Sequence, residues 1–177
     1  MKKTVLRFGS ISGFILVKLS AISYLTIGTD PNNYALSEIV GYTSMVLSLA
    51  IIFFALMHHR KKQGHLNFGQ GFVIGLGIST IAALLFAIFD VFYTTVIEPD
   101  FMTNYMNYYV EQIKNNPNLS ETDRMTQLVE LEAYADMSPA FMGFIMFVTV
   151  WMIGIIMTLI AAAIFKSKKA TQSIDAV

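Results

Sequence analysis

Four long apolar stretches divide the chain, and polar or charged segments separate each from the next. They run over residues 5–27, 36–57, 68–97 and 139–165. Each reaches the roughly 20 residues that an α-helix needs to cross about 30 Å of hydrocarbon. Because backbone groups inside a bilayer must bond within their own segment, the pattern predicts four transmembrane helices. The third stretch is the longest, so we expect it to tilt or to project beyond the bilayer.

The segment over residues 98–138 has a helical periodicity of its own. Its first half places these apolar and aromatic side chains on one face of an amphipathic helix: Phe101, Met102, Tyr105, Met106, Tyr109 and Ile113. Residues 115–118 then break the helix, and Ser120 with Asp123 forms a predicted cap for a second one. The segment therefore predicts a helical hairpin, whose apolar faces must pack on each other, on the membrane surface or on a partner.

Charge is segregated along the chain, although the net charge is zero. Nine of the twelve basic residues lie at the N-terminus, in the loop after the second stretch and in a tail over 166–177: Lys2, Lys3, Arg7, Arg60, Lys61, Lys62, Lys166, Lys168 and Lys169. Segment 98–138 holds eight acidic and two basic residues, a net charge of −6. Basic loops mark the cytoplasmic side. We therefore predict an all-α, four-transmembrane-helix bundle, a single membrane domain over 1–177 with both termini in the cytoplasm and an external amphipathic hairpin between helices 3 and 4.

Three ionisable side chains fall within or at the edge of the apolar stretches: Lys18, Glu38 and Asp90. At 1.5 Å per residue, Lys18 lies about 18 Å above the inner boundary, and Glu38 and Asp90 lie about 28 and 27 Å above it. The lysine side chain can extend outward, and Tyr42 follows Glu38 by one turn on the same face. We predict a polar cluster of Lys18, Glu38, Tyr42 and Asp90 in the outer half of the bundle. In the alternative, Lys18 makes a structural ion pair with Glu38 or Asp90, and the carboxylates are simply interfacial.

Small residues recur four apart on two of the stretches. Gly9 and Gly13 lie on the first, and Gly71, Gly75 and Ser79 lie on the third. Such spacing lets two helix backbones approach closely in lipid. We expect these residues to pack helices within one chain; a dimer interface is the alternative.

Catalytic and cofactor motifs are not recognisable in the sequence. It lacks cysteine, and it contains no metalloprotease, hydrolase, phosphate-loop or dinucleotide-binding pattern. His58, His59 and His65 flank the basic loop, and we interpret them as interfacial polar residues in preference to metal ligands. We therefore expect no enzyme activity, no cofactor, no metal site and no nucleic-acid partner.

Three sequence motifs resemble a known family. Residues 38–45 read Glu-Ile-Val-Gly-Tyr-Thr-Ser-Met, and residues 67–72 read Asn-Phe-Gly-Gln-Gly-Phe. The third, residues 101–114, carries Tyr105, Tyr109 and Glu111. These motifs are similar to those of a bacterial family of unknown function, small four-helix membrane proteins of about this length. The resemblance covers nearly the whole chain and supports the four-span topology. It draws attention to Glu38, Gly41 and Tyr42, and Lys18 belongs to none of the matched motifs.

Two functional interpretations remain open. In the leading one, the chain is a non-enzymatic component of the bacterial inner membrane, with the lipid bilayer around it. Its hairpin at 98–138 would contact a protein partner or a second copy. In the alternative, it is a small transporter or channel subunit with a polar site in the outer half of the bundle. Four helices are few for alternating access, so this alternative requires an oligomer.

Overall fold

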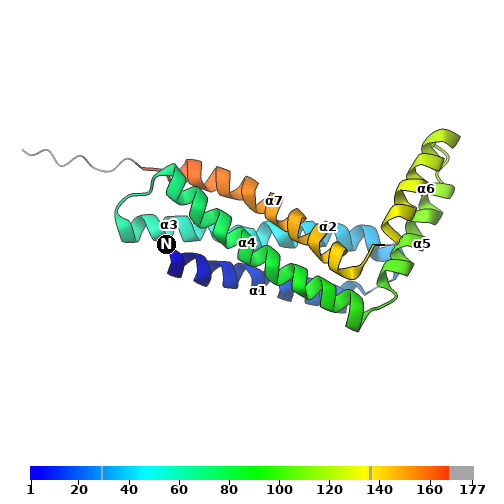
Figure 1. The fold of residues 1–177 in the computed structure, drawn as a ribbon, viewed down its shortest axis with the longest axis horizontal. Helices are drawn as coiled ribbons and strands as arrows, with labels where there is room; N and C mark the ends of the chain where they lie inside the picture. The colour runs from blue at the N-terminus through cyan, green and yellow to red at the C-terminus, as the bar shows by residue number, and fades with distance from the viewer. Residues whose placement is uncertain (29, 136, 168–177) are drawn as a thin grey trace, which may run out of the picture.

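Every regular element of the chain is helical in the computed structural model, which describes residues 1–28, 30–135 and 137–167 (Figure 1). Two single helices, α1 (Lys2–Ile27) and α7 (Pro139–Phe165), are long and apolar enough to cross a membrane, and so is Phe68–Ile97, which consists of α4 (Phe68–Phe92) and the turn that follows it. A fourth such segment, Tyr34–Gln63, begins after the short turn η1 (Pro31–Asn33). The predicted all-α class and the four apolar helices are confirmed. Most of the predicted tail over 166–177, and Asp136 of the acidic segment, lie outside the described residues.

The segment predicted as one span over 36–57 consists of two helices. They are α2 (Tyr34–Leu49) and α3 (Ile51–Gln63), which meet at Ala50. Just before the junction, the hydroxyl of Ser12 on α1 donates a 2.7 Å hydrogen bond to the backbone carbonyl of Ser48. A side chain that inserts into the backbone ladder is a common cause of a break in a helix.

The spanning helices run roughly along the long axis of the molecule, with α4 in contact with both α1 and α7 (Figure 1). Large apolar side chains cover the outward faces: Phe14, Leu47, Ile88 and Ile156 are each more than half exposed. A surface of this kind suits lipid, because a water-soluble protein rarely exposes so much contiguous apolar area.

Small residues lie where these helices cross. A Cβ atom added at Gly75 would lie 2.5 Å from the side chain of Thr158 on α7, and one at Gly71 would lie 3.2 Å from Ala162. Ser79 packs directly against Gly154 of α7. On the other side of α4, Gly9 faces Ile81 and Gly13 faces Leu85 and Ala82. The five small residues singled out from the sequence are thus all at helix contacts within one chain.

Two further helices lie side by side across one end of the bundle (Figure 1). Helix α4 continues into a π-helical turn, η2 (Tyr93–Ile97), before α5 (Phe101–Lys114) and α6 (Glu121–Ala135). Ser120 caps α6 by accepting a hydrogen bond from the amide of Asp123, and Ser138 caps α7 in the same way through Phe141. The chain thus places α5 at the end of the bundle where α1 ends and α2 begins.

Candidate functional site

A cavity of about 560 Å³ lies between this end of the bundle and α5. Residues of α1, α2, α4, α5, α6 and α7 line it, so all the long helices except α3 contribute. Its volume is within the usual range for small-molecule sites. Charged and aromatic side chains both line this cavity.

Glu38 joins α2 to α5 across this cavity. The hydroxyl of Tyr105 donates a 2.7 Å hydrogen bond to Oε1 of Glu38, and the hydroxyl of Tyr109 donates a 2.5 Å bond to the same oxygen. The two tyrosines are four residues apart on α5, so their side chains project from one face of the helix. Glu38 lies in the second turn of α2, level with that face. We call this arrangement the Glu38 clasp; it holds α5 over the cavity.

The two hydroxyls of the Glu38 clasp stay protonated far above neutral pH. Burial, and then the hydrogen bond to Glu38, raises the pKa of Tyr105 well above its usual range. The same two causes raise the pKa of Tyr109 to about 12. Both tyrosines are therefore hydrogen-bond donors at physiological pH, which suits a carboxylate acceptor.

Aromatic rings surround the Glu38 clasp and connect it to the bundle. The ring of Tyr34 at the start of α2 lies within about 6 Å of Phe101, Tyr105 and Tyr108 on α5, measured between centroids. Phe101 also meets Tyr93 of η2, which stacks on Tyr24 of α1 at 3.9 Å. These contacts half-bury the apolar face of α5 against the bundle, where each aromatic ring contributes a large contact area.

Two lining residues have polar groups without a partner among the described residues. Tyr34 is only 3% exposed, and its buried hydroxyl makes no hydrogen bond. The half-buried carboxylate of Asp90 on α4 receives no side-chain or backbone hydrogen bond in the described part of the chain. Buried polar groups are normally satisfied, so each unpaired group calls for an explanation.

The structure brings together three of the four residues predicted as a polar cluster. Glu38, Tyr42 and Asp90 all line the cavity. Lys18 does not: it is exposed on α1, whose buried face carries Leu16 and Ser20. Within the described residues, the single ion pair joins Arg124 to Glu121, so the alternative pairing of Lys18 with a carboxylate is not found there either.

Sequence reasoning did not assign Tyr105, Tyr109, Tyr34 or Tyr24 to this site. The pair on α5 was visible as part of an amphipathic face, and also in the motif that resembles a family. The sequence does not show that this face of α5 covers the carboxylate of Glu38 on α2. Two tyrosines spaced four apart on an otherwise apolar face were the available signal, since each phenol needs a hydrogen-bond partner when it is buried.

The histidines near the other end of the bundle lie apart from this cavity. His59 is buried, and the ring of His58 lies 5.7 Å from that of Phe8. Over residues 1–28, 30–135 and 137–167, no three histidine or acidic side chains are placed to hold a metal ion together.

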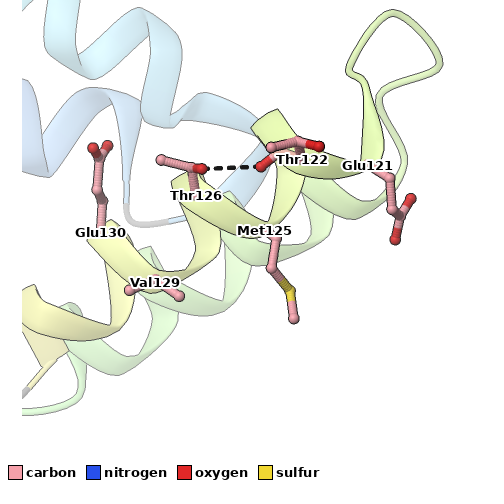
Figure 2. A pocket seen from close by; sticks show the side chains of 6 residues that line it. All are labelled: Glu121, Thr122, Met125, Thr126, Val129 and Glu130. Carbon is pink, nitrogen blue, oxygen red and sulfur yellow. Dashed lines mark hydrogen bonds between the residues drawn. The ribbon is translucent and has the colours of Figure 1, made fainter.

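A second, open hollow lies on the surface of α6 (Figure 2). Met125 and Val129 form its apolar part and are 65% and 60% exposed. Glu121 and Glu130 lie at its two ends. The hydroxyl of Thr126 donates to the backbone carbonyl of Thr122, as the dashed line in Figure 2 shows, so it offers no free donor to a ligand. The hollow is therefore an apolar surface between acidic residues.

Comparison with known proteins identifies one family. Residues 7–167 match the model of a family described as "Protein of unknown function (DUF4199)". No curated protein and no solved structure matches the chain. The cavity and the hollow on α6 therefore have to be interpreted from their own chemistry.

Proposed function

The chain belongs to this family of unknown function, and from its own site we propose that it is a small transporter or channel subunit of the bacterial cytoplasmic membrane. It spans the membrane several times, with both termini in the cytoplasm, and it carries out no catalysis. Helices α5 and α6 are its external amphipathic hairpin. The segregation of lysine and arginine supports this orientation.

The observation that carries the proposal is the cavity beneath α5. Ionisable side chains within membrane segments are expensive, so their presence marks functional sites. Here Glu38 and Asp90 come from different helices and line the same space. The Glu38 clasp closes that space on the side of the hairpin. Since the described part of one copy supplies four spanning segments, too few for alternating access, the working unit is an oligomer.

Swelling of proteoliposomes tests this role without knowledge of the substrate. Purified protein is reconstituted and transferred to iso-osmotic glycerol, choline thiocyanate or sodium glutamate. We expect swelling in at least one solute to be several times faster than in protein-free liposomes. If proteoliposomes and protein-free liposomes swell at the same rate in each of the three solutes, the transport role is wrong.

A pair of matched variants assigns any flux to the cavity. Gly41 lines the cavity, and an added Cβ there would meet nothing within 4 Å. Gly41→Phe should therefore fill the cavity and abolish the flux. Leu47→Phe places the same ring on the outward face of α2, where Leu47 is 61% exposed. This variant should conduct the flux as the wild-type protein does. Equal flux through the two variants would contradict the assignment.

The hollow on α6 supports a second role, as a contact surface for a protein partner. Its exposed apolar centre lies beside Glu130, whereas Glu121 at the other end is paired with Arg124, so the surface suits a partner segment whose apolar side chains are followed by a lysine or arginine. A photo-crosslinker at Met125 should give an adduct of one defined mass, and reversing the charge of Glu130 should remove it. The same crosslinker at Gln127, which lies on the opposite side of α6, is the control. Equal adducts at both positions would argue against this surface.

A further inference from the structure

We propose that the cavity beneath α5 binds a small organic cation, a substituted ammonium that carries an apolar group. This inference rests on the proposed role of the cavity as a ligand site and names the class of its ligand. The argument uses the charge of the lining, its unpaired polar groups and its aromatic and apolar walls.

The charge of the lining has one sign. Glu38 and Asp90 are its two ionisable carboxylates, and no lysine, arginine or histidine is among the described residues that line it. Both tyrosines of the Glu38 clasp bind Oε1, so Oε2 keeps its capacity to accept a bond. Asp90 is uncommitted in the described part of the chain. A ligand that enters this low-dielectric space is favoured if it brings a positive charge.

The hydroxyl of Tyr34 is an independent indication of a ligand. It is buried at the wall of the cavity and has no partner among the described residues, although a phenol in such a place normally finds one. An ammonium N–H that points to this oxygen would satisfy it. The same ligand would lie against the rings of Tyr34 and Tyr105, whose faces attract cations.

The remaining wall suits the apolar part of such a ligand. The cavity is also lined by Met142, Ile145 and Met146 of α7 and by Met102 and Met106 of α5. Methionine side chains are flexible and polarisable, so they adapt to ligands of different shape. A volume of about 560 Å³ accommodates an ammonium group together with an aromatic or branched substituent.

Other cations and lipids fit this lining less well. A metal ion needs several oxygen ligands that converge on one point, and the described residues offer no group of three acidic or histidine side chains for that purpose. The ammonium of a phosphatidylethanolamine headgroup would share the proposed chemistry. Its phosphate, however, would enter a cavity without a basic partner, so we assign the site to a free cation.

Titration of the purified full-length protein in neutral detergent tests the class of ligand. The probes are the N,N-dimethylbenzylammonium cation, which has one N–H to donate, its neutral isostere isobutylbenzene and the anion benzenesulfonate, and binding is followed by calorimetry against empty micelles. We expect the cation to bind at least tenfold more tightly than the neutral isostere and the anion not to bind. Equal affinity for cation and isostere, or no binding of the cation, would overturn the proposal.

Variants then assign the binding to the cavity. Asp90→Asn should weaken binding of the cation at least tenfold and leave that of the neutral isostere unchanged. Lys18→Met, which alters a charge outside the cavity, should bind the cation as the wild-type protein does. If Asp90→Asn binds the cation normally, or if Lys18→Met weakens it as much, the assignment is wrong. Because the wild-type titration uses no variant, a misfolded variant leaves the test of ligand class intact.

Competition with dihexanoyl-phosphatidylethanolamine separates the two sources of an ammonium group. We expect it to displace the probe less effectively than free benzylamine, and more effective displacement would overturn the assignment to a free cation. Failure here is distinguishable from failure of the transport role. Binding without flux would refute transport alone, and flux blocked by Gly41→Phe without cation binding would refute the ligand class alone.

Discussion

Tyr109 of α5 donates a 2.5 Å hydrogen bond to Glu38 of α2, a residue 71 positions earlier in the chain. Tyr105 donates to the same oxygen. A carboxylate near the end of a spanning helix thus holds a helix that lies across that end. The contact closes a cavity, and it explains why a charged residue stands in the first turns of an otherwise apolar segment.

The orientation of the chain can be tested with single cysteines, because the sequence contains none. Asn118 and Gln63 are both exposed, in the turn before α6 and at the end of α3. An impermeant maleimide should label Asn118→Cys in intact spheroplasts, and it should label Gln63→Cys only after lysis. The reverse pattern of labelling would place α5 and α6 in the cytoplasm.

Packing of α4 against α7 depends on the absence of a side chain at Gly75. Gly75→Ala would place a Cβ 2.5 Å from Thr158, and the shift needed to relieve this contact should lower the free energy of unfolding by roughly 1–3 kcal/mol. Gly41→Ala is the control, since it gains the same helix propensity and its Cβ meets nothing within 4 Å. Thermal unfolding in detergent measures the stability of the two variants relative to wild type. A Gly75→Ala variant as stable as Gly41→Ala would refute this packing.

Spectrophotometric titration at 295 nm should reveal the environment of Tyr109. The difference in absorbance at 295 nm between wild type and Tyr109→Phe is expected to titrate with a midpoint near pH 12, compared with an ordinary pKa of 10.0 for tyrosine. Because the folded chain holds this proton more tightly than the unfolded chain, the associated stability is complete below pH 10. It is lost as the pH rises toward 12. Protein unfolded in dodecyl sulfate should titrate near pH 10, and a folded midpoint there would contradict the Glu38 clasp.

The spanning helices could be predicted from sequence because the bilayer imposes a simple rule on length and polarity. Residues 139–165 show this well, since no charge interrupts them and Ser138 with Pro139 starts the helix. The break at Ala50 could not be predicted, because it coincides with a hydrogen bond from Ser12 on another helix. Local sequence around Ala50 remains apolar and helix-compatible, so it carries no signal of the break.

The site was predictable only in part, for a related reason. Depth along the helices places Glu38 and Asp90 at one level, and both do line the cavity. Depth does not fix the rotation of a helix about its axis. Lys18 consequently lies on the exposed face of α1, although its height allowed a contact with the carboxylates. The partners of Glu38 come from α5, whose position depends on the path of the chain through η2.

Hydrogen exchange over α5, followed by mass spectrometry, tests the central claim most directly. The claim is that the Glu38 clasp holds this helix closed over the cavity. In Tyr105→Phe/Tyr109→Phe, the rings remain and the two bonds to a charged acceptor are lost, so exchange over residues 101–114 should accelerate roughly tenfold or more. Residues 68–92 of α4 should exchange as in wild type. Tyr108→Phe, whose hydroxyl is not one of the two that bind Glu38, should leave α5 unchanged. Unaltered exchange over 101–114 in the double variant would show that Glu38 does not hold α5, and the account of the cavity would be wrong.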